Sequence, residues 1–257
     1  MAPPTKTQNA DLGTLIVTGA SRGIGAAIAR LAGQRGYAVA VNYSTGKAEA
    51  GNVVTEIIGA GGRALAIHAD VADEKQIVEM FETAEQELGP VKALVNNAGI
   101  TGRFARVEDV TLEAINKTFA VNVTGSILCA REAVRRMSTR RGGSGGAIVN
   151  ISSRAAHTGA AGEWVHYAAS KGAIDSFTIG LAREVATEGI RVNAVAPGLV
   201  DTDIHAAGEP GRLQRLMSTI PMHRAGQPEE IAEAVLWLLS PAASYVTGSI
   251  LVAGGGR

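Results

Sequence analysis

The chain has 257 residues, enough for one large domain with a sizeable core or for two small ones. Basic and acidic residues each number 24, and this balance indicates neither a nucleic-acid surface nor an anionic membrane partner. The single cysteine, Cys129, excludes an internal disulfide and a cysteine-based metal cluster, which fits a reducing compartment. Residues 1–12 lack the apolar core of a secretory signal, and no apolar run approaches the roughly 20 residues that cross a bilayer. We therefore expect a disordered N-terminal arm on a cytoplasmic protein with no membrane partner.

Short apolar, β-branched runs alternate with helical stretches over residues 13–257, and no linker interrupts them. These runs predict buried strands at 15–18, 38–42, 64–70, 93–99, 147–152, 190–198 and 250–252. Helical periodicity and glycine stops predict helices at 24–34, 48–58, 73–88, 112–137, 165–188 and 229–239. Asp73 and Gln76 form a capping pattern at the third of these helices. Strict alternation implies a single α/β domain, in which helices cover both faces of a seven-stranded, doubly wound parallel sheet.

The longest segment without periodicity runs from Pro197 to Gln227. Long irregular segments in compact domains are often functional, so we expect this one to be a lid over a substrate.

The first strand ends in the glycine-rich run TGASRGIG, residues 18–25. Such a turn lets the backbone approach a pyrophosphate, which then lies at the positive N-terminus of the following helix. The spacing of Gly19, Gly23 and Gly25 is GxxxGxG, which differs from the common GxGxxG fingerprint. The GxxxxGK[ST] loop of nucleotide triphosphatases is absent from the sequence. We therefore expect a dinucleotide rather than a triphosphate at this turn.

The run YAASK places Tyr167 and Lys171 four residues apart, on one face of a helix. An adjacent ammonium favours a phenolate, so this spacing predicts a tyrosine pKa lowered from about 10 toward neutral. A phenol tuned in this way can give or take a proton at physiological pH. The ordinary alternative for this pair is a surface tyrosine beside a solvated lysine.

These motifs, together with NNAG (96–99), Asn122, Ser153 and PGLVDT (197–202), resemble the short-chain dehydrogenase/reductase family. The resemblance extends from about Gly13 to the C-terminus. It implies a Rossmann domain that transfers hydride between NAD(P)(H) and a small-molecule carbonyl or alcohol, and it implies a homotetramer. The chain is also similar to bacterial 3-oxoacyl-carrier-protein reductases and glucose dehydrogenases.

The resemblance assigns the catalytic roles to Asn122, Ser153, Tyr167 and Lys171. Hydride arrival at a carbonyl carbon develops negative charge on the oxygen, which Ser153 would hydrogen-bond while Tyr167 donates a proton. Lys171 would keep the tyrosine pKa low and, by resemblance, bind the nicotinamide ribose. Asn122 resembles the family's asparagine that holds a water between this lysine and solvent, although it could instead satisfy a backbone group. Ser152 competes with Ser153, and we favour Ser153 because family sequences place the active serine second in NIS-S.

Cofactor choice depends on the end of the second strand. NAD enzymes usually place an acid there, and a carboxylate would repel a 2′-phosphate. Here Tyr43 stands at that position, and Arg22 could pair with the phosphate, although it could also be a solvated loop charge. We therefore expect NADP(H) to be preferred over NAD(H). The expected cofactor groove consists of Gly19, Ser21, Arg22, Gly23, Ile24, Gly25, Asn42, Tyr43, Ser44, Asp70, Val71, Asn97, Ala98, Gly99, Tyr167, Lys171, Pro197, Gly198, Val200 and Thr202.

The histidines and the charged residues near the end of the 112–137 helix support weaker conclusions. The five histidines show no metal-ligand spacing, and we expect no metal site. Arginines between 131 and 141 form a basic helix end that could meet an acidic carrier protein, but cations are favourable at any helix C-terminus. Glu188 stands where a carrier-protein reductase is expected to have a basic residue. A 3-oxoacyl-[acyl-carrier-protein] reductase therefore stays the alternative within the class. A non-catalytic NADP(H) sensor is the alternative of another class, disfavoured because Tyr167 and Lys171 are both present.

Overall fold

The computed structural model describes residues 12–202 and 212–257. The expected N-terminal arm therefore lies almost wholly outside the described residues, and so does the middle of the expected lid. Seven parallel strands form one sheet in the order β3-β2-β1-β4-β5-β6-β7. The strands are β1 (Thr14–Val17), β2 (Ala38–Tyr43), β3 (Arg63–His68), β4 (Val91–Asn96), β5 (Gly146–Ile151), β6 (Ile190–Pro197) and β7 (Ile250–Ala253). The predicted α/β fold with a doubly wound parallel sheet is confirmed.

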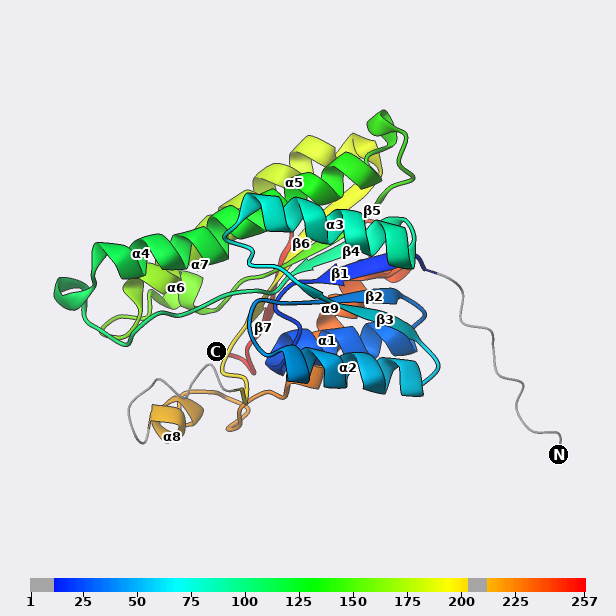
Figure 1. The fold of residues 1–257 in the computed structure, drawn as a ribbon. Coiled ribbons are helices and arrows are strands. Elements are labelled where there is room, and N and C mark those ends of the chain that lie inside the picture. The colour runs from blue at the N-terminus through cyan, green and yellow to red at the C-terminus, as the bar shows by residue number, and fades with distance from the viewer. Residues whose placement is uncertain (1–11, 203–211) are drawn as a thin grey trace.

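Helices cover both faces of this sheet (Figure 1). One layer consists of α1 (Gly23–Gln34), α2 (Lys47–Gly59) and α9 (Pro228–Leu239). The opposite layer consists of α3 (Glu74–Leu88), α5 (Ser126–Met137) and α7 (Val165–Val185). The remaining helices are α4 (Leu112–Phe119), α6 (Ala155–Thr158) and α8 (Arg212–Met217). No described helix is both long enough and apolar enough to cross a membrane.

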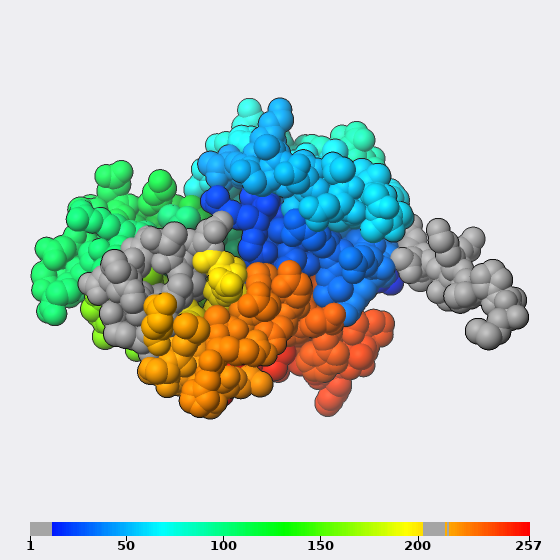
Figure 2. Space-filling view, turned by 90° about the horizontal axis from the view of Figure 1, so that it is seen from below, coloured from blue at the N-terminus to red at the C-terminus, as the bar shows by residue number. Residues whose placement is uncertain are grey.

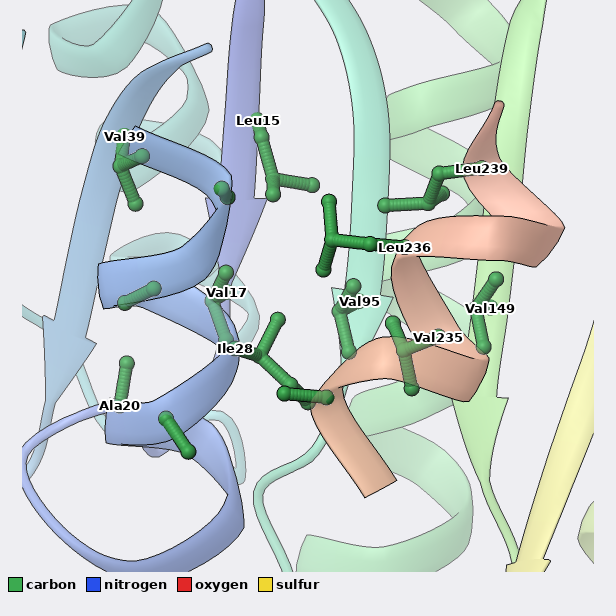
Figure 3. Close-up of a cluster of buried hydrophobic side chains, with 14 of the residues drawn as sticks. Leu15, Val17, Ala20, Ile28, Val39, Val95, Val149, Val235, Leu236 and Leu239 are labelled. Carbon is green, nitrogen blue, oxygen red and sulfur yellow. The ribbon is translucent and has the colours of Figure 1, made fainter. Parts of the chain in front are cut away.

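Strand alternation divides the core into two layers. Leu15 and Val17 belong to the layer under α1 and α9, whereas Ile16 between them packs into the layer under α3 and α5. Figure 3 shows the first layer, where Ile28 of α1 meets Leu236 of α9 over the strands. Because both faces of these strands are covered, β1 and β2 contain continuous apolar runs, Leu15–Val17 and Ala38–Val41, instead of alternating apolar and polar residues.

The expected cap of the third helix is confirmed, since the Asp73 carboxylate accepts hydrogen bonds from the backbone N–H groups of Lys75 and Gln76. The predicted continuous helix at 112–137 is interrupted by a π-helical turn, Ala120–Gly125, between α4 and α5. The predicted helix at 165–188 ends as a regular α-helix at Val185 and closes with a 3-10 turn, Ala186–Glu188. The segment after β6 contains α8, which its irregular sequence did not indicate.

Candidate active site and cofactor groove

One long cavity of about 1180 Å³ lies at the carboxyl ends of the strands. The sheet order reverses between β1 and β4, and ligands of open α/β sheets bind at this switch point. Figure 2 shows the chain around residue 200 in yellow at the surface, between the blue N-terminal region and the orange segment that contains α8 and α9. Every residue that we expected in the cofactor groove lines the cavity, as do Ser153, Tyr167 and Lys171. Asn122, which lies behind the wall, is the exception among the expected site residues.

The glycine turn is held against the end of β4 with no room for side chains. Gly19 has a φ of +61°, a left-handed conformation that favours glycine. A Cβ added at Gly25 would lie 2.4 Å from Nδ2 of Asn97 and 2.5 Å from the carbonyl oxygen of Gly19. Glycine at position 25 therefore lets the first turn of α1 pack directly against Gly19 and Asn97, which brings the helix N-terminus, the site that favours a pyrophosphate, to the cavity.

Thr18 and Asn97 brace this turn from both strands. The Thr18 hydroxyl accepts hydrogen bonds from the backbone N–H groups of Asn97 and Ala98, both at 3.0 Å. The Asn97 amide donates to the carbonyl oxygens of Thr18 (2.8 Å) and Gly19 (2.9 Å). The sequence analysis did not single out Thr18. The signal that could have identified it is its position as a hydroxyl residue at the end of an apolar strand.

Asn42 serves the same purpose from β2. Its side chain accepts from the N–H of Gly19 at 3.1 Å and donates to the carbonyl of Ala69 at 3.0 Å. The next residue, Tyr43, is buried and packs edge-on against His68, with ring centroids 5.5 Å apart. The end of β2 thus offers the cavity no carboxylate, and the nearest acid along its rim is Asp70 after β3.

Arg22 precedes the first turn of α1 in an extended conformation and is exposed. Its guanidinium makes no ion pair or hydrogen bond with the part of the chain that the structure describes. The charge at this end of the cavity is therefore available to an anion.

Tyr167 and Ser153 meet across the cavity. Burial of the phenol raises the pKa of Tyr167, and the nearby Ser153 hydroxyl lowers it by less. The direction is opposite to our expectation of a pKa drawn toward neutral. The prediction was wrong because it counted the neighbouring lysine and omitted desolvation, which disfavours the phenolate.

Lys171 lies beside the tyrosine, with its Nζ 5.8 Å from the centre of the ring. The ammonium donates a hydrogen bond to the carbonyl oxygen of Ile151 at 2.7 Å. Burial lowers the pKa of Lys171 to about 8, against the opposing effect of Asp175. The lysine is thus a buried ammonium whose pKa lies close to neutral pH, as its proposed role beside a proton donor needs.

The two adjacent serines face different neighbours. The Ser152 hydroxyl is buried near the carboxyl of Asp175. Burial raises the pKa of Asp175, and the Ser152 hydroxyl lowers it by less. Ser153 accepts a hydrogen bond from the N–H of Ala155 at 3.1 Å and reaches Tyr167. This arrangement agrees with the choice of Ser153 over Ser152.

Asn122 is fully buried in the π-helical turn. Its Oδ1 accepts from the N–H of Ile100 at 2.8 Å, and its Nδ2 donates to the carbonyl of Ile100 (2.9 Å) and to Oγ of Ser170 (3.0 Å). The side chain therefore satisfies a backbone group, the alternative that we left open, although that group belongs to the loop after β4 rather than to its own helix.

Several lining residues were not expected from the sequence. They include Arg154 after the active serine, Lys117 of α4 and the C-terminal residue Arg257. Trp164, which flanks Tyr167 in the sequence, also lines the cavity. It packs edge-on against Phe104, with ring centroids 5.3 Å apart, and so forms an apolar wall.

The basic end of α5 is compensated by carboxylates. Glu132 is almost completely buried and pairs with Arg131 (3.1 Å), Arg135 (2.8 Å) and Arg136 (2.9 Å). Arg140 pairs with Glu188 at 3.0 Å. This arrangement favours a structural role for the arginine run over an exposed docking patch. Among the described residues, no group of three or more histidine, cysteine or acidic side chains is placed to hold a metal ion.

The family model described as Enoyl-(Acyl carrier protein) reductase matches residues 19–257. The chain belongs to the short-chain dehydrogenase/reductase family. It is 55% identical to the uncharacterized oxidoreductase YgfF of Escherichia coli (strain K12), covering 94% of this chain and 98% of that one. It is 38% identical to a 3-oxoacyl-[acyl-carrier-protein] reductase of Synechocystis sp., covering 94% and 95%.

A solved structure supports the same assignment. The chain is 38% identical to a blue fluorescent protein from a metagenomic library, crystallised in complex with NADPH. The two superpose with a TM-score of 0.89 over 97% of this chain and 99% of that one. The resemblance drawn from the motifs is thereby confirmed, and the protein is an NAD(P)-dependent oxidoreductase of this family.

Proposed function

We propose that this protein is an NADP(H)-dependent carbonyl reductase or alcohol dehydrogenase in which Tyr167 is the general acid and base. The observation that carries the proposal is the convergence of Ser153, Tyr167 and Lys171 in the same cavity as the glycine turn. A nicotinamide dinucleotide fits the groove, because the glycine turn brings the N-terminus of α1 to the cavity and Arg22 lies at its rim with no partner among the described residues. When bound, the cofactor supplies or accepts the hydride.

The side chains of the site stabilise charge and move a proton. A carbonyl oxygen held by the Ser153 and Tyr167 hydroxyls gains negative charge during reduction, and hydrogen bonds to it strengthen in the transition state. The raised pKa of Tyr167 keeps the phenol protonated at neutral pH, so the group can donate its proton to the developing alkoxide. Lys171, with a pKa of about 8, is mainly protonated at pH 7 and stabilises the phenolate that this transfer leaves.

The test of this role compares wild type with Tyr167→Phe in a reductase assay. The assay follows loss of NADPH or NADH absorbance with sugars, diketones, quinones, steroid ketones and 3-oxoacyl thioesters. The substitution should lower kcat by about 10²-fold or more, because it removes the proton donor, while the Kd for NADPH stays nearly constant. Tyr245→Phe is the matched control, because Tyr245 is fully exposed. Equal turnover by wild type and Tyr167→Phe would refute the proposed role.

We further propose that NADP(H) is preferred over NAD(H). Tyr43 occupies the position where an acid would repel the 2′-phosphate, the exposed Arg22 can attract that phosphate, and the solved neighbour was crystallised with NADPH. Replacing Arg22 with alanine should weaken NADPH binding by about 1.5–3 kcal/mol, the magnitude of a charged hydrogen bond, and NADH binding by much less. Fluorescence titration measures both affinities. Arg30→Ala is the control, since Arg30 lies on the same helix and pairs with Glu56. Equal losses for both cofactors would contradict the assignment.

A 3-oxoacyl thioester is the second candidate substrate, favoured by the Synechocystis relative and opposed by the carboxylates that neutralise the end of α5. The thioester arm of the assay separates the two. Binding of NADPH with no turnover of any substrate would instead favour the sensor alternative.

We also propose a cytoplasmic homotetramer with α4, α5 and α7 at its interface. Leu112, Ile127 and Ile179 are exposed on these helices, and a mass near four times 26.4 kDa in light scattering would support the assembly.

A further inference from the structure

Arg154 is a cation in the cavity wall whose guanidinium has no partner among the described residues. It follows Ser153 directly, so the two Cα atoms are about 3.8 Å apart. Its backbone N–H donates to the carbonyl of Pro197 at 2.9 Å, which fixes the residue where β6 ends. Its Nε atom is buried without a hydrogen-bond partner, and its guanidinium forms no ion pair with the described residues. Buried polar groups are normally satisfied, so an orphaned guanidinium in a cavity wall requires an explanation.

Two other partly buried arginines, Arg191 and Arg136, have partners. Arg191, also partly buried, donates to the carbonyls of Leu238 and Leu239 at 2.7 and 3.2 Å. Arg136 has the carboxylates of Glu85 and Glu132. Because the fold satisfies such groups elsewhere, the free guanidinium beside the active serine points to a ligand that satisfies it.

The charges around Arg154 favour an anion. Among the described residues, the part of the cavity away from the glycine turn is lined by the cations Lys171 and Lys117, and the acid there is Glu163, which has an interaction of its own. The stem of Arg154 lies close to Gly254, next to the backbone of Arg257, so the C-terminal turn supports it. The pyrophosphate and the 2′-phosphate of a dinucleotide belong at α1 and Arg22, so neither accounts for Arg154.

We propose that Arg154 is a specificity-determining residue that binds a carboxylate on the substrate. The proposal rests on the reductase function proposed above and narrows its substrate class to oxo acids and hydroxy acids. A guanidinium fork matches a planar carboxylate with two parallel hydrogen bonds. Trp164, packed on Phe104, offers the body of the same molecule an apolar wall. The substrate is therefore an apolar carbon frame that bears a reducible carbonyl and a carboxylate.

The test compares aliphatic and cyclic oxo acids of graded length with their methyl esters, which keep the carbonyl and lose the charge. Wild type should prefer an acid to its ester by about 10- to 100-fold in kcat/KM, with most of the difference in KM. Arg154→Ala should bring that ratio close to one, and Arg154→Lys should retain part of it. Arg103→Ala is the matched control, because Arg103 is exposed on a nearby loop and is absent from the cavity wall; its acid-to-ester ratio should equal that of wild type.

A binding measurement keeps the inference testable if no acid in the panel is reduced. Benzoate should raise the melting temperature of the wild-type NADPH complex, methyl benzoate should not, and Arg154→Ala should abolish the effect of benzoate. Equal turnover of acids and esters by wild type would overturn the carboxylate proposal and leave the reductase proposal standing. A preference for acids that survives Arg154→Ala would overturn the role of this residue. Activity that survives Tyr167→Phe would refute the proposed mechanism whatever the substrate.

Discussion

The side chain of Asn122 provides the sharpest test of how this site is built. Replacing it with alanine removes the hydrogen bonds to the N–H of Ile100, to its carbonyl and to the hydroxyl of Ser170. The Ser170 hydroxyl loses a partner in a fully buried position, where water does not easily replace it, and the backbone groups of Ile100 lose theirs in a partly buried one. Ile100 lines the cavity, so the substitution also loosens the wall beside Lys171.

The expected cost follows from these contacts. A typical intramolecular hydrogen bond contributes about 1 kcal/mol net, and a buried group left unsatisfied costs about 1–3 kcal/mol. The three bonds therefore predict a loss of about 2–4 kcal/mol in the free energy of unfolding. Since whole proteins are stable by about 5–15 kcal/mol, this loss is a large fraction of the total.

Urea denaturation at fixed protein concentration measures the loss, because the midpoint moves in proportion to stability when the slope is unchanged. Thr118→Val is the matched control, since Thr118 is buried one turn earlier and its hydroxyl has no partner among the described residues. This variant should be as stable as wild type or more stable. A loss below about 0.5 kcal/mol in Asn122→Ala, with a strong fall in kcat, would refute the bracing role and leave the water relay as the reason for this asparagine.

Two further predictions concern the glycine turn and the lysine. Gly25→Ala places a methyl group 2.4 Å from the Asn97 amide, so NADPH titration should show at least about tenfold weaker binding. Gly51→Ala is the control, because the space around Gly51 is open, and this variant should bind NADPH normally. Unchanged affinity in Gly25→Ala would mean that the turn relaxes freely. The pKa of Lys171 is about 8 in the folded protein and 10.5 in the unfolded chain. Between pH 8 and pH 10.5 the unfolded chain therefore binds more protons than the folded protein, and the free energy of unfolding rises with pH across this range. Urea midpoints across this range should therefore rise for wild type relative to Lys171→Met, and parallel curves would show that the lysine pKa is not shifted.

Much of the fold could be predicted because local chemistry determines it. Apolar β-branched runs gave all seven strands in the correct order along the chain, and the carboxylate of Asp73 marked the start of a helix. The π-helical turn at Asn122 could not be predicted, since nothing in the sequence of AVNVTG distinguishes it from a regular helix. A tertiary contact accompanies it, since the Asn122 side chain accepts a hydrogen bond from the loop at Ile100, and the Ser126 hydroxyl donates locally to the Asn122 carbonyl.

The site was predictable in its residue types and less so in its energetics. The positions of Tyr167 and Lys171 follow from helical spacing, but burial decides their pKa values, and burial depends on segments distant in sequence. Arg154 was overlooked for the same reason. An arginine in a loop is usually a solvated charge, and only the packing of the C-terminal turn against its stem shows that this one is enclosed.

The polar residues at the strand ends explain why the groove can exist before any ligand binds. Thr18 and Asn97 join β1 to the end of β4, and Asn42 joins the glycine turn to the chain after β3. Lys171 ties α7 to the end of β5 through Ile151. Each bond crosses between neighbouring elements, so the backbone facing the cavity is fixed by side-chain hydrogen bonds. A dinucleotide that enters such a groove needs little ordering of the protein, and rigid pre-organisation of this kind increases affinity by lowering the entropic cost of binding. It follows that substitution of Thr18, which is absent from the cavity wall, should weaken cofactor binding even though its side chain does not reach the cofactor.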